Sequence, residues 1–217
     1  MAGYFGDVAI AYDRDLGPVL FQPYAIDIAR LATKRAVRHV LEIAACTGIV
    51  TRQLRDALPR DALLTAIDIS DSMMDVARIK FLSHEQVTFQ VADATALPFE
   101  DEAFDAVICQ FGVMFFDKDA AFREARRTLR QGGKYLFSVW DSRRYNPFAS
   151  VTFEVMKQFF PATPPGSLNF LFPASKSTLS RRRSSVRGLT GLSSRSSGGN
   201  MIFSTFRPSP GGSYSAL

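Results

Sequence analysis

The sequence contains few of the residues that build disulfide frameworks or metal centres. Only two cysteines and two histidines occur among 217 residues. Cys46 and Cys109 stand 63 residues apart in apolar stretches, which excludes a disulfide scaffold and indicates a reducing compartment. We therefore expect a cytoplasmic protein without a bound metal. No apolar run approaches the ~20 residues that span a bilayer, and the first residues do not resemble a signal peptide.

Acidic residues are absent from the last part of the chain. Residues 173–217 hold seven basic residues and no acidic one, so the net charge of +5 belongs to this tail. Residues 1–172 hold 19 basic and 21 acidic residues. The tail also has 13 Ser, 6 Gly and 3 Pro in 45 residues, a composition typical of disorder, although 200–206 is compatible with one strand. We predict a globular domain over 1–172 and a Ser/Arg/Gly-rich tail over 173–217.

Two origins of the tail fit its composition: an altered reading frame or a natural disordered extension. The nearly neutral body has no basic surface pattern, so we expect no nucleic-acid partner. A binding protein that uses the basic tail is one alternative function. The sequence gives no indication of oligomeric state.

Short apolar runs alternate with helical patterns along the body. The runs predict strands at 39–45, 62–68, 86–92, 104–111 and 134–140. Apolar residues at helical spacing predict helices at 48–58, 70–81, 117–133 and 147–160, the third of which we expect to stop at Gly132–Gly133. A leading amphipathic helix is expected from Gly17 to Ala36. This order predicts an α/β fold with a doubly wound, mainly parallel Rossmann-like sheet flanked by helices.

Acidic residues stand where the first three strands end. Glu42 and Asp68 close the first two strands, and Asp93 follows the third. In an open parallel sheet, ligands bind at these carboxyl ends. Asp68 is placed to accept hydrogen bonds from ribose hydroxyls, and Asp93 from the exocyclic amine of a purine. Each aspartate taken singly is equally well explained as a helix or turn cap.

The sequence motifs of two common nucleotide-binding sites are missing at these strand ends. No GKS or GKT phosphate loop occurs, and G-x-G-x-x-G is absent from 42–48, which disfavours a dehydrogenase. Strand-end acids without a phosphate cradle suit a nucleoside that bears a positive charge.

Four segments in order resemble motifs of the class I S-adenosylmethionine-dependent methyltransferases. They are VLEIAACTG, TAIDISDSMM, VADATALPFEDEAFDAVICQFGVMFF and REARRTLRQGGKYLFSVWD. The resemblance covers roughly residues 8–170 and is strongest to the small-molecule group that includes the ubiquinone and menaquinone C-methyltransferases. It implies transfer of a methyl group from S-adenosylmethionine to a small-molecule acceptor.

The resemblance also assigns cofactor-binding roles by position. Glu42 orients the loop near the methionine moiety, Asp68 binds the ribose, and Gly48 lets the following helix pack close to the ligand. The remaining positions flank the adenine (Ile69 and Met73), meet its edge (Asp93 and Ala94) or line the donor and acceptor cleft (Gln110 and Phe111).

Two departures from the family pattern stand out. Ala44 and Cys46 occupy the first two glycine positions of the loop, and the Cβ of Cys46 threatens the close backbone approach that glycine allows. Family members also complete the sheet with a closing antiparallel strand pair, which is not readable here. A non-catalytic methyltransferase remnant is therefore a further alternative. Cys46 itself is better explained as a small apolar filler than as a nucleophile.

The acceptor and the catalytic residues are not indicated by the sequence. Tyr12 and Asp13 in the leading segment are weak candidates for the cleft, and Trp140 is placed to face the acceptor. Quinones, phenols, fatty acids and amines all stay open as acceptors.

Overall fold

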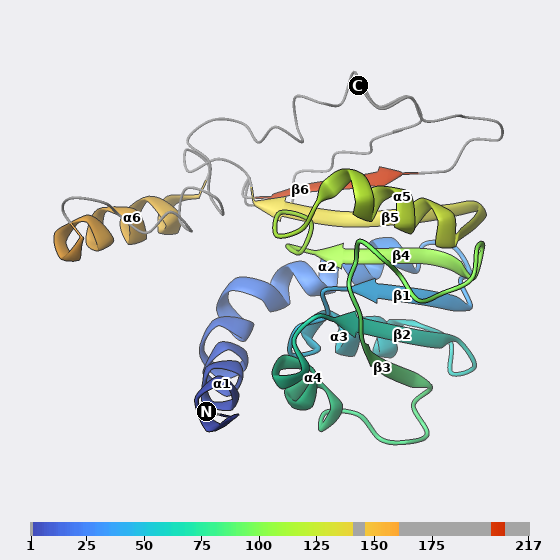
Figure 1. The fold of residues 1–217 in the computed structure, drawn as a ribbon, viewed down its shortest axis with the longest axis horizontal. Helices are drawn as coiled ribbons and strands as arrows, with labels where there is room; N and C mark the ends of the chain where they lie inside the picture. Colours follow the sequence, from blue (N-terminus) through green and yellow to red (C-terminus); the bar gives the residue numbers. More distant parts are fainter. Residues whose placement is uncertain (1, 141–145, 161–200, 207–217) are drawn as a thin grey trace.

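The computed structural model describes residues 2–140, 146–160 and 201–206, and a single sheet forms its centre (Figure 1). The strands are β1 (His39–Ile43), β2 (Leu63–Asp68), β3 (Val87–Val91), β4 (Phe104–Gln110), β5 (Leu129–Trp140) and β6 (Met201–Phe206). The helices are α1 (Ala2–Ala11), the π-helix η1 (Tyr12–Phe21), α2 (Gln22–Ala32), α3 (Ile49–Ala57), α4 (Asp71–Arg78), α5 (Lys118–Thr128) and α6 (Pro147–Phe159).

The strand order places the middle of the sheet at β1 and β4. The order is β3-β2-β1-β4-β5-β6, and β1 pairs in parallel with both β2 and β4. The chain therefore winds outward in two directions from β1 and β4, which makes their carboxyl ends the topological switch point where such sheets bind ligands. The predicted doubly wound α/β fold is confirmed.

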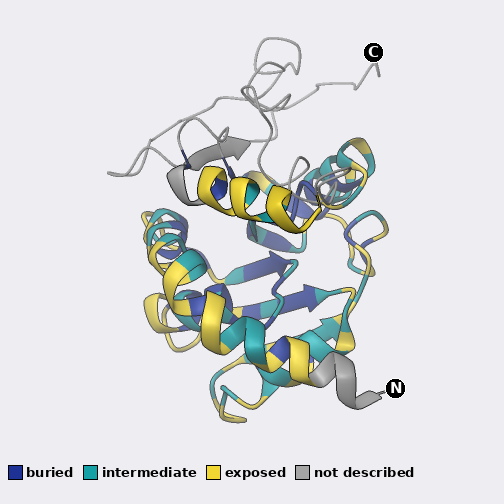
Figure 2. Ribbon diagram, turned by 90° about the vertical axis from the view of Figure 1, so that its left-hand side faces the viewer, coloured by how far each residue is buried: buried dark blue, intermediate teal, exposed yellow. Residues whose placement is uncertain are grey.

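Apolar runs buried by helices form the core of the sheet. Val40, Leu41 and Ile43 in β1 are at most 1% exposed, as are Ala106 and Ile108 in β4. Helices α2 and α3 lie on one face and α5 on the other (Figure 1). Figure 2 shows buried central strands beneath helices with exposed outer faces. Burial on both faces explains why these strands read as continuous apolar runs in the sequence.

Side-chain caps start two helices where the sequence predicted them. The Ser70 side chain accepts a hydrogen bond from the backbone N–H of Met73, and the Asp117 side chain accepts one from Ala120. These bonds satisfy N–H groups that lack partners in the first turn of a helix.

The leading helix differs from its prediction in extent and geometry. Helical structure runs from Ala2 to Ala32 rather than from Gly17 to Ala36, and residues Tyr12–Phe21 form a π-helix that contains Pro18. Proline lacks a backbone N–H and interrupts regular α-helical bonding. The widened stretch therefore could not be recognised from α-helical spacing.

The predicted end of the α5 helix at Gly132–Gly133 was wrong. The helix ends at Thr128, and both glycines lie within β5, which begins at Leu129. Leu129 pairs with Phe104, and the register shifts between Phe104 and Ala106. A Cβ at Gly133 would lie 2.8 Å from the Arg130 carbonyl oxygen. The two glycines thus accommodate an irregularity within the strand and do not end the helix.

One antiparallel strand extends the sheet beyond β5. Residues of β6 pair from Trp140↔Met201 to Tyr135↔Phe206, at the position that the sequence marked as compatible with a strand. The sheet therefore has one antiparallel strand beyond β5 among the described residues. The rest of the tail over 173–217, with the predicted disorder, lies outside them. In the part of the chain that the structure describes, no helix is long and apolar enough to cross a membrane.

Candidate functional site

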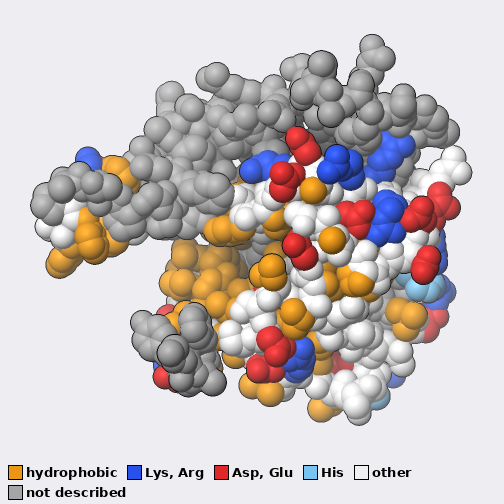
Figure 3. Space-filling model, viewed as in Figure 1, with side chains coloured by type: hydrophobic (Ala, Val, Ile, Leu, Met, Phe, Trp, Pro, Cys, Tyr) orange, Lys and Arg blue, Asp and Glu red, His pale blue; other side chains and the backbone are white. Residues whose placement is uncertain are grey.

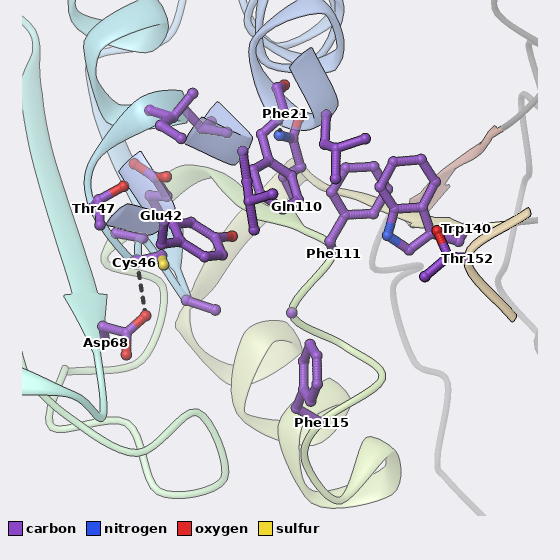
Figure 4. Close-up of a pocket in the computed structure, with 18 residues that line it drawn as sticks. Phe21, Glu42, Cys46, Thr47, Asp68, Gln110, Phe111, Phe115, Trp140 and Thr152 are labelled. Atoms are coloured by element: carbon purple, nitrogen blue, oxygen red, sulfur yellow. Dashed lines mark hydrogen bonds between the residues drawn. The ribbon is translucent and has the colours of Figure 1, made fainter. Parts of the chain in front are cut away.

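A cavity of about 560 Å³ opens at the carboxyl ends of β1, β2 and β4 (Figure 4). Six predicted site residues line it: Glu42, Ala44, Cys46, Asp68, Gln110 and Phe111. Tyr12 and Trp140, the weaker candidates, line it too. The switch point of the sheet therefore brings together predicted residues that are up to 128 positions apart in the sequence.

The loop from β1 to α3 adopts the backbone shape of a glycine loop without its first two glycines. Ala44 and Cys46 have φ angles of 58° and 52°, and Gly48 has 78°. Left-handed conformations cost roughly 1–2 kcal/mol for residues with a Cβ. The loop thus keeps the glycine-type path at Ala44 and Cys46 at the expense of backbone strain.

Gly48 meets a steric requirement as well as a conformational one. A Cβ at this position would lie 2.9 Å from the Ala77 Cβ in α4. The α3 helix can begin close to α4 only because no side chain intervenes. Gly48 does not line the cavity, and its expected role of letting the helix pack close to the ligand stays a prediction.

Asp68 holds the loop to the end of β2. Its Oδ2 accepts a hydrogen bond from the Cys46 backbone N–H at 2.8 Å, and its Oδ1 accepts one from Ser70 at 2.9 Å. Each carboxylate oxygen has a further lone pair for a ligand hydroxyl. Asp68 is therefore both the anchor of the loop and a free acceptor site on the cavity wall.

Glu42 is a buried carboxyl group on the cavity wall. It is 2% exposed, and its Oε2 has no hydrogen-bond partner among the described residues. Burial raises the pKa of Glu42 to about 8, and the nearby Asp68 adds to this increase. The carboxyl group is thus protonated at neutral pH unless a cation binds beside it.

Aromatic side chains form the opposite wall. The rings of Phe111 and Trp140 stack at 4.1 Å between centroids, and Tyr24 meets both edge-on at 5.7 and 5.4 Å. Phe111 has a φ of 56°, so the chain turns sharply after β4 and places this ring at the switch point. Figure 3 shows hydrophobic side chains gathered in the hollow between α1 and α6. This side of the cavity suits an apolar molecule.

The residues predicted for the adenine lie outside the cavity. Ile69 is 73% exposed, and Asp93 is exposed with its Oδ1 accepting hydrogen bonds from the Thr95 backbone N–H and hydroxyl. Ala94 is buried, and the Met73 Sδ lies 3.7 Å from the Cys46 Sγ. All four follow the ends of β2 or β3, on the side of Asp68 away from β4.

Several cavity residues were missed by the sequence analysis. They are Leu16, Leu20, Phe21, Ala45, Thr47, Ile49, Val50, Gly112 and Thr152. Most are apolar and read as core positions, so no local signal distinguishes them. Asp13 does not line the cavity, but its carboxylate accepts a hydrogen bond from the Thr47 hydroxyl at 2.7 Å.

The cavity contains few groups that ionise near neutral pH. Burial raises the pKa of Cys46 to about 11 and holds the pKa of Tyr12 well above its ordinary value. Both side chains are therefore protonated, and Cys46 is no thiolate nucleophile. Neither histidine is among the cavity residues. His39 begins β1 and so lies at the amino end of the strand, opposite to the end at which the cavity opens.

The chain is similar to methyltransferases in sequence and in fold. Residues 41–137 match the family model described as a methyltransferase domain. A ubiquinone/menaquinone biosynthesis C-methyltransferase of Hahella chejuensis is 35% identical over 71% of this chain and 65% of its own length. A demethylmenaquinone methyltransferase of Clavibacter sepedonicus is 34% identical over 62% of this chain and 55% of its own. The chain thus spans less than two thirds of these relatives.

Two solved structures share the fold over most of the chain. A Methanococcus maripaludis protein described as an S-adenosylmethionine-dependent methyltransferase has a TM-score of 0.62 at 18% identity and covers 94% of both chains. A Pyrococcus horikoshii protein has a TM-score of 0.60 at 22% identity, over 84% of this chain and 87% of its own.

Proposed function

We propose that this chain, which carries a class I methyltransferase domain, binds S-adenosylmethionine and transfers its methyl group to a small-molecule acceptor. One observation carries the proposal: Glu42, Asp68 and a left-handed loop meet at one cavity on the switch point of the sheet. The methyltransferase relatives support the same reaction. In this proposal the chemistry belongs to the domain over 1–172, and the tail over 173–217 takes no part in it, although its strand β6 extends the sheet.

Two acidic side chains on the cavity wall suit the methionine and ribose parts of the cofactor. Glu42 offers a buried carboxyl oxygen that has no partner in the described part of the chain, which suits the positively charged methionine end of the donor. Asp68 keeps lone pairs for both ribose hydroxyls. The remaining proposed contacts are the loop positions (Ala44, Cys46, Gly48), the adenine positions (Ile69, Met73, Asp93, Ala94) and the boundary with the acceptor (Gln110, Phe111).

The reaction requires little acid–base chemistry from the protein. S-adenosylmethionine supplies a methyl group that is already activated on a sulfonium. The chain then contributes mainly orientation of the two reactants and exclusion of water. Tyr12 and Cys46 are protonated in the cavity, so we assign neither the role of general base.

The aromatic wall indicates the kind of acceptor. Phe111 and Trp140 form a stacked pair, and Phe21 and Phe115 also line the cavity. Such a wall favours a flat apolar molecule through ring contacts and burial. Demethylmenaquinone, named for one relative, has this character and is the first acceptor to test. Both cysteines are free thiols, in keeping with the proposed cytoplasmic location.

Labelled methyl transfer tests the proposed activity. The full chain is incubated with S-adenosylmethionine carrying a ¹⁴C-methyl group and a panel of quinols, phenols, fatty acids and amines. We expect label in an organic-soluble product of the quinol or phenol class. Binding of S-adenosylhomocysteine without transfer to any class would favour the non-catalytic remnant, for which the strained Ala44 and Cys46 positions are the supporting observation.

A further inference from the structure

The cavity is covered by a segment whose own backbone holds it weakly. This roof segment is η1 (Tyr12–Phe21), and four of its side chains line the cavity: Tyr12, Leu16, Leu20 and Phe21. π-Helical bonding is rare over more than one turn, and Pro18 removes one N–H donor from the middle of the segment. Its position over the cavity therefore depends on contacts with the rest of the domain.

Polar contacts tie the roof segment down at both of its ends. Near its start, Asp13 Oδ1 accepts a hydrogen bond from the Thr47 hydroxyl at 2.7 Å and forms an ion pair with Lys80. At its end, the Phe21 carbonyl oxygen accepts a hydrogen bond from Gln110 Nε2 at 3.1 Å. The side chains between these ties are mostly apolar.

The partners of Asp13 belong to the elements that enclose the proposed cofactor site. Thr47 is fully buried and lies between Cys46 and Gly48 in the β1–α3 loop, which Figure 4 shows beside Asp68. Lys80 lies two residues beyond the end of α4. The Asp13 and Lys80 side chains are only 24% and 26% exposed, so water screens the pair less than at an open surface. The Asp13 carboxylate thus joins the roof segment, the β1–α3 loop and the end of α4.

We propose that Asp13 is a positioning residue that latches the roof segment onto the β1–α3 loop. This latch couples closure of the acceptor side of the cavity to cofactor binding. The coupling part of this inference rests on the proposed function. A ligand that fixes the loop conformation stabilises the Asp13–Thr47 contact and hence the closed roof. Because coupling between two sites is reciprocal, a closed roof also strengthens cofactor binding by the same factor.

Cleavage by trypsin after Arg14 reports opening of the roof. The Arg14 side chain is 70% exposed and lies within the segment. Changes at Thr47 and Lys80 leave the cleavage sequence intact, whereas a change at Asp13 would alter it. Thr47→Val removes the hydroxyl at nearly constant volume, Thr47→Ser retains it, and Lys80→Met removes the charge.

In the ligand-free full chain, Thr47→Val should speed cleavage after Arg14 roughly tenfold to a hundredfold, since a lost hydrogen bond to a charged group raises the open population by about that factor. Lys80→Met should speed it less, and Thr47→Ser should behave as wild type. The matched control is Thr65→Val in β2, which does not line the cavity and should leave the rate unchanged. Equal cleavage of Thr47→Val, Lys80→Met and wild type overturns the latch.

Saturating S-adenosylhomocysteine tests the coupling. It should slow cleavage after Arg14 in wild type and slow it much less in Thr47→Val, with binding measured in parallel by calorimetry. Bound ligand with equal slowing in both proteins overturns the coupling. If calorimetry detects no binding to wild type, the proposed function fails, and the ligand-free comparison still decides the latch.

Discussion

Replacing Glu42 by glutamine should stabilise the ligand-free protein, and the gain should depend on pH. Glu42 is 2% exposed, and burial raises its pKa to about 8 from an ordinary value of 4.5. Between these two values the unfolded chain releases the proton of Glu42 while the folded chain keeps it. The folded state then binds more protons, so the free energy of unfolding falls as pH rises.

The size of the effect follows from the pKa shift. Each pH unit within this window costs wild type ~1.4 kcal/mol, so the penalty grows by roughly 4 kcal/mol between pH 5 and pH 8. Glu42→Gln keeps the shape of the side chain and carries no ionisable proton. Its advantage over wild type should therefore increase by that amount across the window.

Urea unfolding at pH 5, 6, 7 and 8 measures this difference. Glu100→Gln removes an exposed carboxyl group and is the matched control, which should follow wild type at every pH. A Glu42→Gln advantage that stays constant from pH 5 to pH 8 would refute the reasoning, because it would show that Glu42 ionises alike in the folded and unfolded states.

Other changes test the loop. Cys46→Gly should raise the free energy of unfolding by ~1 kcal/mol, because glycine accepts the φ of 52° without strain; Ala45→Gly, at a neighbouring position without a positive φ, should lower it, and urea unfolding compares the two. A lower stability for Cys46→Gly would show that the contact of the thiol with Met73 outweighs the strain. Gly48→Ala should lower stability by roughly 2 kcal/mol or more, since φ is 78° and the new Cβ would meet Ala77 at 2.9 Å. Wild-type stability in Gly48→Ala would mean that α3 shifts away from α4 without cost.

The central strands were predictable because they are buried on both faces. The runs at 39–45 and 62–68 match β1 and β2 within two residues at each end. The end of α5 was not predictable, because Leu129 leaves the helix in order to pair with Phe104, a contact 25 residues away in the sequence. The rule that glycine ends a helix considers only local conformation, and it therefore failed at 132–133.

The candidate site was predictable only where chemistry marks it. Glu42 and Asp68 are acids at strand ends, a pattern visible in the sequence. Phe21 and Leu16 line the cavity because they belong to the π-helix η1 that covers it. No sequence period indicates such a helix. Asp13 was expected near the cleft, but its role as a tie to Thr47 depends on tertiary packing.

Calorimetric titration with S-adenosylhomocysteine tests the central claim most directly, with Asp68→Ala as the decisive variant. Asp75→Ala in α4 is the matched control, since its carboxylate is 69% exposed and pairs with Arg78. Wild type and Asp75→Ala should bind one ligand per chain with equal affinity. Asp68→Ala should bind roughly tenfold to a hundredfold more weakly, because it loses charge-assisted hydrogen bonds to the ribose and the tie to the loop. Absence of binding to wild type, or equal affinity in Asp68→Ala, would contradict the account.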